Sequence, residues 1–200
     1  MVMSQDGVNK GRRTLLLGAT TAVGAVGAGF VAVPFVKSWV PSERAKAAGA
    51  PAKVDISKIE PGAMLTAEWR GKPVYVARRT QEMLDVLPEL SDRLKDPDNS
   101  VKTQQPAYAD NINRSREPEL IVLLGVCTHL GCAPKYHAEV KPEPFDENWK
   151  GGWFCPCHGS RFDLSGRVFK GSPAATNLVV PPYMYESDNV IVVGEDEENA

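Results

Sequence analysis

Two six-residue segments contain all four cysteines of this chain and two of its three histidines. The first segment, CTHLGC, covers residues 127–132, and the second, CPCHGS, covers residues 155–160. Thiolate and imidazole groups are ligands that zinc ions and iron–sulfur clusters use in proteins. Cysteines that only fill a core would not gather in two places, so the pattern predicts a metal centre.

Three possible occupants of this centre differ in how many of the six groups they use. A tetrahedral zinc ion needs four ligands and leaves two groups over. A cluster bound by four cysteines leaves both histidines unused. An iron–sulfur cluster bound by one cysteine and one histidine from each segment leaves two cysteines, which can form a disulfide in a protein exported from the cytoplasm.

Together the two segments resemble the Rieske [2Fe–2S] motif, and the chain is similar to the Rieske iron–sulfur subunits of the bacterial cytochrome bc complex, a quinol–cytochrome c reductase. The resemblance implies that Cys127 and Cys155 bind one iron. It implies that His129 and His158 bind the other. It also implies a disulfide between Cys132 and Cys157.

The resemblance implies an electron-transfer subunit of an oxidoreductase and translocase. In this family one quinol electron reaches the Rieske cluster and then a c-type cytochrome subunit, while the other goes to a haem of cytochrome b. His158 is expected to meet the quinol oxygen, with His129 exposed beside it, as the candidate catalytic residues. Histidine ligands raise the cluster potential from about −400 mV to about −150 to +300 mV, which suits quinol. The expected partners are the cytochrome b and c-type cytochrome subunits, in a dimeric complex of the inner membrane.

Residues beside the ligands have counterparts in the family. Ser160 matches a serine whose hydroxyl bonds a bridging sulfide. Residues 171–175, GSPAA, resemble the proline loop that covers the cluster, with Ser172 added before Pro173. Phe162 stands where many relatives have a tyrosine that donates to a cysteine ligand, so we expect a lowered reduction potential.

Other residues near the two segments have less specific roles. Three glycines are expected to let backbone amides approach the cluster: Gly131, Gly159 and Gly166. Leu130 is expected either to shield the site from water or to pack as an ordinary apolar residue. His137 lies outside both segments and is expected to be a surface residue.

Two other functions stay open on the sequence. One is the Rieske subunit of a different exported oxidoreductase, such as arsenite oxidase. The other is a zinc-stabilised, membrane-anchored binding domain without redox activity. The apolar N-terminal segment and the long insertion at residues 80–118 favour the quinol–cytochrome c reductase. Nucleic-acid binding is not expected, because the chain has a net charge of −2 and its body lacks clustered lysine and arginine.

An uncharged run between Arg13 and Lys37 predicts a membrane-spanning helix, because it is long enough to cross a hydrocarbon core of about 30 Å. Arg12 and Arg13 resemble a twin-arginine export signal, which places the N-terminus in the cytoplasm. The alternatives to a membrane-spanning helix are a cleaved signal peptide and a buried soluble helix, the latter disfavoured because the run has no polar face. The alternative to a flexible tether after the span is a short helix that continues it. The predicted order begins with a cytoplasmic signal segment (residues 1–13), a transmembrane helix (14–39) and a flexible tether (40–54). A periplasmic Rieske domain (55–200) follows, with its cluster-binding subdomain at about residues 125–176.

The apolar pattern of the body predicts a mainly antiparallel β fold, with stacked β-sheets and a smaller cluster-binding subdomain. The predicted strands cover residues 62–69, 72–79, 119–126, 151–154 and 190–194. Arg70 and Gly71 form the predicted turn between the first two strands, and the strand at 119–126 is apolar enough to be covered on both faces. We expect a helix interrupted by Pro88, followed by a solvated surface excursion up to residue 118.

Overall fold

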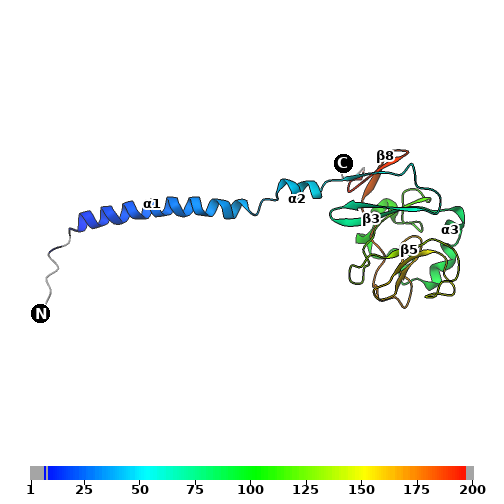
Figure 1. Cartoon of the computed structure of the whole chain (residues 1–200). Helices are drawn as coiled ribbons and strands as arrows, with labels where there is room; N and C mark the ends of the chain where they lie inside the picture. The colour runs from blue at the N-terminus through cyan, green and yellow to red at the C-terminus, as the bar shows by residue number, and fades with distance from the viewer. Residues whose placement is uncertain (1–6, 8, 197–200) are drawn as a thin grey trace. The chain divides into compact units, whose positions relative to one another are not determined.

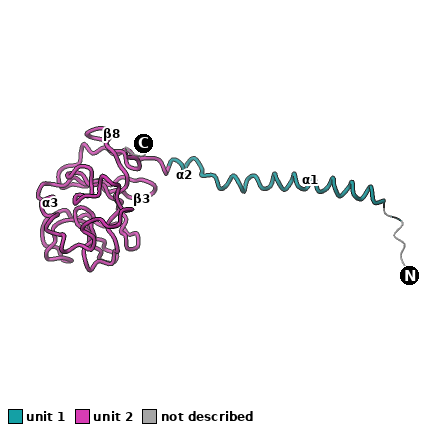
Figure 2. The backbone as a smooth tube through the Cα atoms, turned by 180° about the vertical axis from the view of Figure 1, so that it is seen from behind, with its two compact units in different colours: residues 1–47 teal, residues 48–200 magenta. Residues whose placement is uncertain are grey.

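The computed structural model describes residue 7 and residues 9–196. It contains two compact units, residues 1–47 and residues 48–200, which Figure 2 distinguishes by colour. Residues 1–6 and 8 of the expected cytoplasmic segment lie outside the described residues, as do the last four residues of the chain.

The first unit consists mainly of one long helix, α1 (Lys10–Lys37). Asn9 caps it by accepting a hydrogen bond from the Arg12 amide at 3.1 Å, so the helix begins before the predicted span. Its 28 residues correspond to a length of about 42 Å. Among the described residues this is the one helix long and apolar enough to cross a membrane, and its leucines, valines and phenylalanines are exposed.

The segment expected to be a flexible tether, residues 40–54, is partly ordered. It contains the short helix α2 (Glu43–Ala48), and its last residues belong to strand β1 (Ala52–Asp55). Strand β1 pairs with β9 (Val190–Val193), which in turn pairs with β8 (Tyr183–Ser187). The last residues of the predicted tether segment therefore pair, as part of β1, with the C-terminal hairpin.

Three three-stranded sheets, antiparallel throughout, form the second unit (Figure 1). Besides the β1–β9–β8 sheet, there is one made of β2 (Met64–Trp69), β3 (Lys72–Arg78) and β4 (Leu120–Leu124), and one made of β5 (Lys135–His137), β6 (Gly152–Cys155) and β7 (Ser160–Phe162). The stacked antiparallel fold predicted from the sequence is confirmed.

The predicted β2–β3 hairpin is confirmed, together with its turn. Arg70 and Gly71 both have positive φ angles, 52° and 70°, as a tight two-residue hairpin turn requires. Strand β4 is almost entirely buried, which confirms the interpretation of its continuous apolar run. Strands β1, β5, β7 and β8 were not predicted, because their three to five residues carry little periodicity and, unlike those of the equally short β9, do not form a continuous apolar run.

The insertion confirms the predicted break at Pro88, with a helix on one side, α3 (Gln81–Asp85), and a 3₁₀ helix on the other, η1 (Pro88–Arg93). Two further 3₁₀ turns follow, η2 (Lys102–Gln104) and η3 (Ala107–Ala109).

The expectation of a purely solvated excursion up to residue 118 is wrong. Five residues of this stretch are buried: Asn99, Gln105, Ala109, Arg114 and Ser115. Polar composition hid this burial, because hydrogen bonds within the protein satisfy buried polar side chains: Arg114 donates to the Ser165 carbonyl, and Gln105 donates to the Asn99 carbonyl.

The core explains how the insertion reaches the third sheet. Leu87, from the insertion, packs in one cluster with Leu164, which follows β7. Leu94 packs in another cluster with Trp149 and Phe169. The largest cluster joins all three sheets and includes Cys127 and Cys155. Both cysteines are therefore embedded in packed structure.

Candidate metal centre

The first cysteine–histidine segment is a closed loop between β4 and β5. The Cys127 amide donates to the Cys132 carbonyl at 2.8 Å, and the Gly131 amide donates back to the Cys127 carbonyl at 3.0 Å. Gly131 has a φ of 85°, which favours glycine. These bonds bring Cys132 back beside the start of the loop, which begins at a buried Cys127.

The second segment is the connection of the β6–β7 hairpin. Cys155 is the last residue of β6 and lies opposite Ser160, the first residue of β7. The Gly159 amide donates to the Cys155 carbonyl at 2.9 Å, and Gly159 has a φ of 75°. The backbone therefore turns within four residues, which leaves Cys157 and His158 exposed at the tip.

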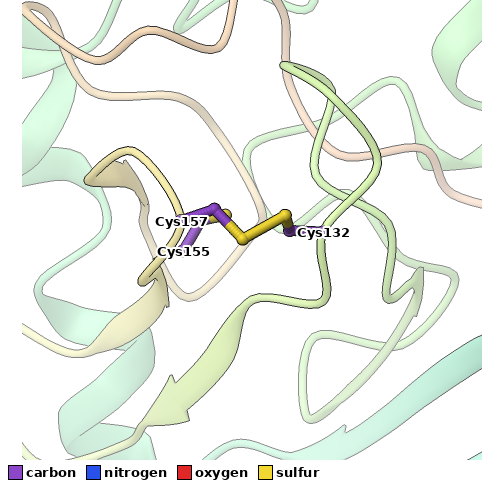
Figure 3. A group of neighbouring side chains, drawn as sticks. All are labelled: Cys132, Cys155 and Cys157. Atoms are coloured by element: carbon purple, nitrogen blue, oxygen red, sulfur yellow. A yellow bond between two sulfur atoms is a disulfide. The ribbon is translucent and has the colours of Figure 1, made fainter.

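A disulfide between Cys132 and Cys157 joins the two loops (Figure 3), as the resemblance implied. The sulfur atoms of Cys132, Cys155 and Cys157 lie within 4.8 Å of one another. Two of these sulfurs are consumed by the disulfide, so this trio cannot serve as three thiolate ligands. The free thiols are Cys127 and Cys155.

The remaining four groups form two pairs. The thiols of Cys127 and Cys155 are both buried and close enough to interact, and burial raises the pKa of Cys155. The rings of His129 and His158 lie edge to face, with their centroids 4.8 Å apart. The structure thus brings together all six predicted residues, with thiol beside thiol and imidazole beside imidazole.

The donor set fits a cluster with two cysteine and two histidine ligands. Among the described residues, Nδ1 of His129 is buried and has no hydrogen-bond partner. A buried imidazole nitrogen without a partner is costly unless a missing group satisfies it, and a metal ion would do so. Two soft thiols and two imidazoles are also the ligands of a Rieske cluster.

Comparison with known proteins identifies the family. Residues 91–183 match the description "Rieske [2Fe-2S] domain", and residues 2–42 match "Ubiquitinol-cytochrome C reductase Fe-S subunit TAT signal". The ubiquinol-cytochrome c reductase iron-sulfur subunit of Allochromatium vinosum is 56% identical over 198 residues, which cover 99% of this chain and 95% of the relative. This chain belongs to the ubiquinol-cytochrome c reductase iron-sulfur subunits.

More distant members of the family match over nearly the same length. The subunit of Rhodospirillum rubrum is 41% identical over 192 residues, covering 96% of each chain. That of Blastochloris viridis is also 41% identical, over 96% of this chain and 97% of its own. Family membership decides between the occupants considered above: the cofactor is a [2Fe–2S] cluster of the Rieske type, not a zinc ion.

Several neighbouring residues of this iron–sulfur subunit support the two loops. Ser160 is completely buried, and its Oγ accepts a hydrogen bond from the Ala174 amide at 3.0 Å. Its own hydroxyl hydrogen can still donate, as the expected bond to a sulfide requires. Ser172 binds the adjacent strand β7, where its Oγ accepts a hydrogen bond from the Arg161 amide at 3.0 Å.

The three glycines differ in what they do. Gly131 and Gly159 have open space where a side chain would lie, so their positive φ angles explain the choice of glycine. At Gly166 a Cβ would meet Leu123 at 3.0 Å and Leu178 at 3.2 Å. Gly166 thus allows close packing beneath the site as well as its own positive φ of 73°.

Two other expectations are settled by exposure. Leu130 is 70% exposed, so the alternative that it packs as an ordinary apolar residue is wrong. His137 is half-buried in β5, with its Nδ1 3.4 Å from Oε1 of Glu143, and it is not part of the two loops. It was expected to be a surface residue, and its side chain is instead half-buried.

The residues that fix the loops from outside were not predicted from the sequence. Tyr75 in β3 donates a hydrogen bond to the Pro134 carbonyl at 2.9 Å, just after the first loop. A Cβ on Gly125 would lie 2.4 Å from its ring, so glycine is needed just ahead of Cys127. A glycine two residues before the first cysteine was the available signal, but its partner lies 50 positions earlier in the chain.

A buried ionic network supports the turn that follows β7. Arg167 forms an ion pair with Asp163 at 2.7 Å, and both side chains are almost fully buried. Arg79 reaches the same turn from the end of β3 and donates to the Leu164 carbonyl and to Oγ of Ser165. Burial lowers the pKa of Arg79 to about 10. The guanidinium groups of Arg79 and Arg167 thus link the insertion at residues 80–118 to the turn that follows β7.

Proposed function

We propose that this chain is the electron-transfer subunit of a quinol–cytochrome c reductase and that its two loops hold one Rieske [2Fe–2S] cluster. Cys127 and Cys155 would bind one iron through Sγ, and His129 and His158 would bind the other through a ring nitrogen. The observation that supports this assignment is the pairing of the four side chains, with two buried thiols in contact and two imidazoles 4.8 Å apart.

When bound, such a cluster supplies a one-electron acceptor with a potential of about −150 to +300 mV, which suits a quinol donor. Nδ1 of His129 is buried and unpartnered among the described residues, which favours this atom as the iron ligand and leaves Nε2 as the outer nitrogen. His158 is exposed, so its ring can contact a substrate.

We assign the proton step to His158. Its outer ring nitrogen would accept a hydrogen bond from the quinol hydroxyl and hold the proton that leaves with the electron. Leu130, exposed beside His129, would exclude water from this contact once a partner covers it. Ser160 would donate its hydroxyl hydrogen toward a bridging sulfide, because its Oγ is already fixed by the Ala174 amide.

The partners follow from the same reaction. The quinol site would be completed by the cytochrome b subunit, and the electron would pass to a c-type cytochrome subunit, in a dimeric complex. Residues 40–51, between α1 and β1, would act as the tether on which the domain moves between these partners. A location outside the cytoplasm is supported by the Cys132–Cys157 disulfide and by the twin arginines before α1.

Histidine variants of the complete complex in native membranes test this proposal. His129→Ala and His158→Ala should each lose cluster iron, the electron paramagnetic resonance (EPR) signal of the reduced cluster, and quinol-dependent reduction of cytochrome c. His137→Ala is the matched control, because it removes the one histidine outside the two loops.

The control should retain all three properties. The proposal is wrong if either loop variant keeps its iron and its quinol-dependent cytochrome c reduction. Copurification is a second check, because cytochromes b and c should accompany the wild-type chain. A large molybdenum protein in their place would indicate a different exported oxidoreductase.

A further inference from the structure

Residues 171–176, here named the cover segment, are hydrogen-bonded to both loops of the metal centre. The Ala174 amide donates to Oγ of Ser160 in the second loop at 3.0 Å. Thr128, in the first loop, donates from Oγ1 to the Thr176 carbonyl at 2.6 Å. The cover segment is therefore in direct contact with both loops.

A third contact to the cover segment comes from outside the loops. Nζ of Lys95 donates to the Ser172 carbonyl at 2.6 Å and to the Ala174 carbonyl at 2.7 Å. Both polar backbone groups of Ala174 are thus held, the amide by Ser160 and the carbonyl by Lys95. Lys95 belongs to the insertion at residues 80–118, in the part that was predicted to be a solvated surface excursion.

The backbone around Lys95 is itself fixed. The Lys95 amide donates to the Val168 carbonyl at 2.9 Å, and the Lys170 amide donates to the Arg93 carbonyl at 2.8 Å. Leu94 and Phe169 form an antiparallel bridge between the same two stretches and pack in one core cluster. The lysine side chain therefore extends from an anchored base, and its two bonds transmit the position of the insertion to the cover segment.

The charge of Lys95 strengthens this contact. A hydrogen bond from an ammonium group to a carbonyl is stronger than one between neutral groups. Lys95 is exposed, so solvent screens part of the gain. Its loss would still leave the Ser172 and Ala174 carbonyls without this donor, at the segment that is bonded to both loops.

We propose that Lys95 is a positioning residue that clamps the cover segment against the two cysteine–histidine loops and limits the access of solvent to the centre between them. This inference rests on the proposed function in one respect, namely that the centre between the loops holds the [2Fe–2S] cluster. It assigns a role to the insertion: Lys95 stabilises residues 171–176 in their position against the loops.

Hydrogen exchange of the full-length, cluster-loaded protein in detergent tests the clamp, with Lys95→Met, Lys95→Arg and a matched control compared in parallel. The control is Lys170→Met, because Lys170 is also exposed and donates from Nζ to a single carbonyl across the same two stretches, that of Asp92, at 2.8 Å. Iron release to a chelator and the EPR signal are followed in the same samples.

Lys95→Met should speed amide exchange of residues 172–176 by about tenfold, the factor expected when a charge-assisted hydrogen bond of ordinary strength is lost. Iron release should accelerate in parallel, and the EPR signal should broaden. Lys95→Arg should restore the wild-type behaviour to within about twofold, because it keeps the charge and the donors. Lys170→Met should stay within about twofold of wild type.

The clamp is ruled out if Lys95→Met behaves like Lys170→Met in exchange and iron release. It is also ruled out if exchange rises throughout residues 48–196 together with a lower unfolding midpoint, because that result would indicate general destabilisation. The exchange measurement does not need the cluster. A wild-type protein without iron would therefore overturn the proposed function while exchange still decides the clamp.

Discussion

Phe162 lies directly opposite Trp153 in the β6–β7 pair, and both side chains are completely buried. Cys155 is two residues beyond Trp153, so its side chain is on the same face of the sheet. Phe162 is therefore the diagonal neighbour of Cys155, a position from which an aromatic side chain can reach across. Nothing on the phenyl ring can donate a hydrogen bond to the sulfur.

Phe162→Tyr should raise the reduction potential of the cluster. The added hydroxyl would reach the Cys155 side and stabilise the extra negative charge of the reduced state. The expected shift is on the order of tens of millivolts, because about 59 mV corresponds to a tenfold change in a one-electron equilibrium. Protein-film voltammetry of the loaded full-length chain measures it.

The matched control for this substitution is Phe154→Tyr. Phe154 lies between Trp153 and Cys155 on β6, so its side chain is on the other face, where it stacks on Phe145 with centroids 4.0 Å apart. Its hydroxyl should leave the potential unchanged. An unchanged or lower potential in Phe162→Tyr would contradict the prediction.

The double substitution Cys132→Ser with Cys157→Ser should destabilise the domain and empty the metal centre. The disulfide joins residues separated by 25 positions, and closing such a loop stabilises the folded state by about 3–4 kcal/mol. Without it, the two loops lose their covalent link. Iron content and urea unfolding followed by circular dichroism provide the measurements.

Full iron content and a wild-type unfolding midpoint in the double variant would show that the link is dispensable. Wild-type protein treated with excess thiol reductant is the companion experiment. Its unfolding midpoint should move toward that of the double variant.

Arg79→Met should lower the free energy of unfolding by about 2–4 kcal/mol, because it leaves several buried acceptors without a donor. Arg79 donates to the Pro118 and Asn113 carbonyls in the insertion, as well as to the turn after β7. Denaturant unfolding of the full-length protein measures the loss.

Arg78→Met is the control for Arg79. Arg78 is half-buried and donates to only two carbonyls, those of Ile59 and Ile56, at 2.8 and 3.3 Å. Its substitution should cost about 1 kcal/mol. An equal decrease in the free energy of unfolding for the two variants would contradict the role of Arg79 in linking the insertion to the turn after β7.

Tyr136→Phe should reduce the loss of stability at alkaline pH. Burial raises the pKa of Tyr136 to about 12, against an ordinary value of 10.0, although the nearby charge of Arg79 opposes this rise. As pH rises, Tyr136 therefore ionises in the unfolded state before it ionises in the folded state. The free energy of unfolding of the wild type is unaffected below pH 10 and falls as pH rises from 10 toward 12. At pH 11 this loss, which Tyr136→Phe avoids, is about 1.4 kcal/mol.

The unfolding free energy measured at pH 8 and pH 11 checks this prediction. At pH 8 the variant should be as stable as wild type or slightly more so, because the Tyr136 hydroxyl has no hydrogen-bond partner among the described residues. Tyr185→Phe is the positive comparison. Burial also raises the pKa of Tyr185 to about 12, so this variant should recover a similar amount of stability at pH 11. An identical alkaline loss in wild type and Tyr136→Phe would contradict the assignment.

Much of the candidate site could be predicted because its chemistry is local in sequence. Each loop carries one free cysteine, one histidine and one disulfide cysteine within six residues, beside glycines that allow the turns. The β2–β3 hairpin was similarly readable, since Arg70 and Gly71 mark its turn.

The contacts of the insertion were not predictable in this way. Lys95 binds carbonyls 77 and 79 positions later, and Arg79 binds a serine 86 positions later. A polar residue that donates to distant backbone has the same local pattern as one that faces water. Composition therefore suggested a solvated excursion where the fold has a buried network.

By itself the sequence determined the set of donors, two thiols and two imidazoles beyond a possible disulfide, and an apolar segment long enough to span a membrane. Only the tertiary structure decided which groups face one another: thiol beside thiol, imidazole beside imidazole, and Lys95 on the cover segment. The physical reason is that donor type is a property of each residue. Pairing depends on how the β4–β5 connection and the β6–β7 hairpin are held together by packing and hydrogen bonds from segments far away in the chain.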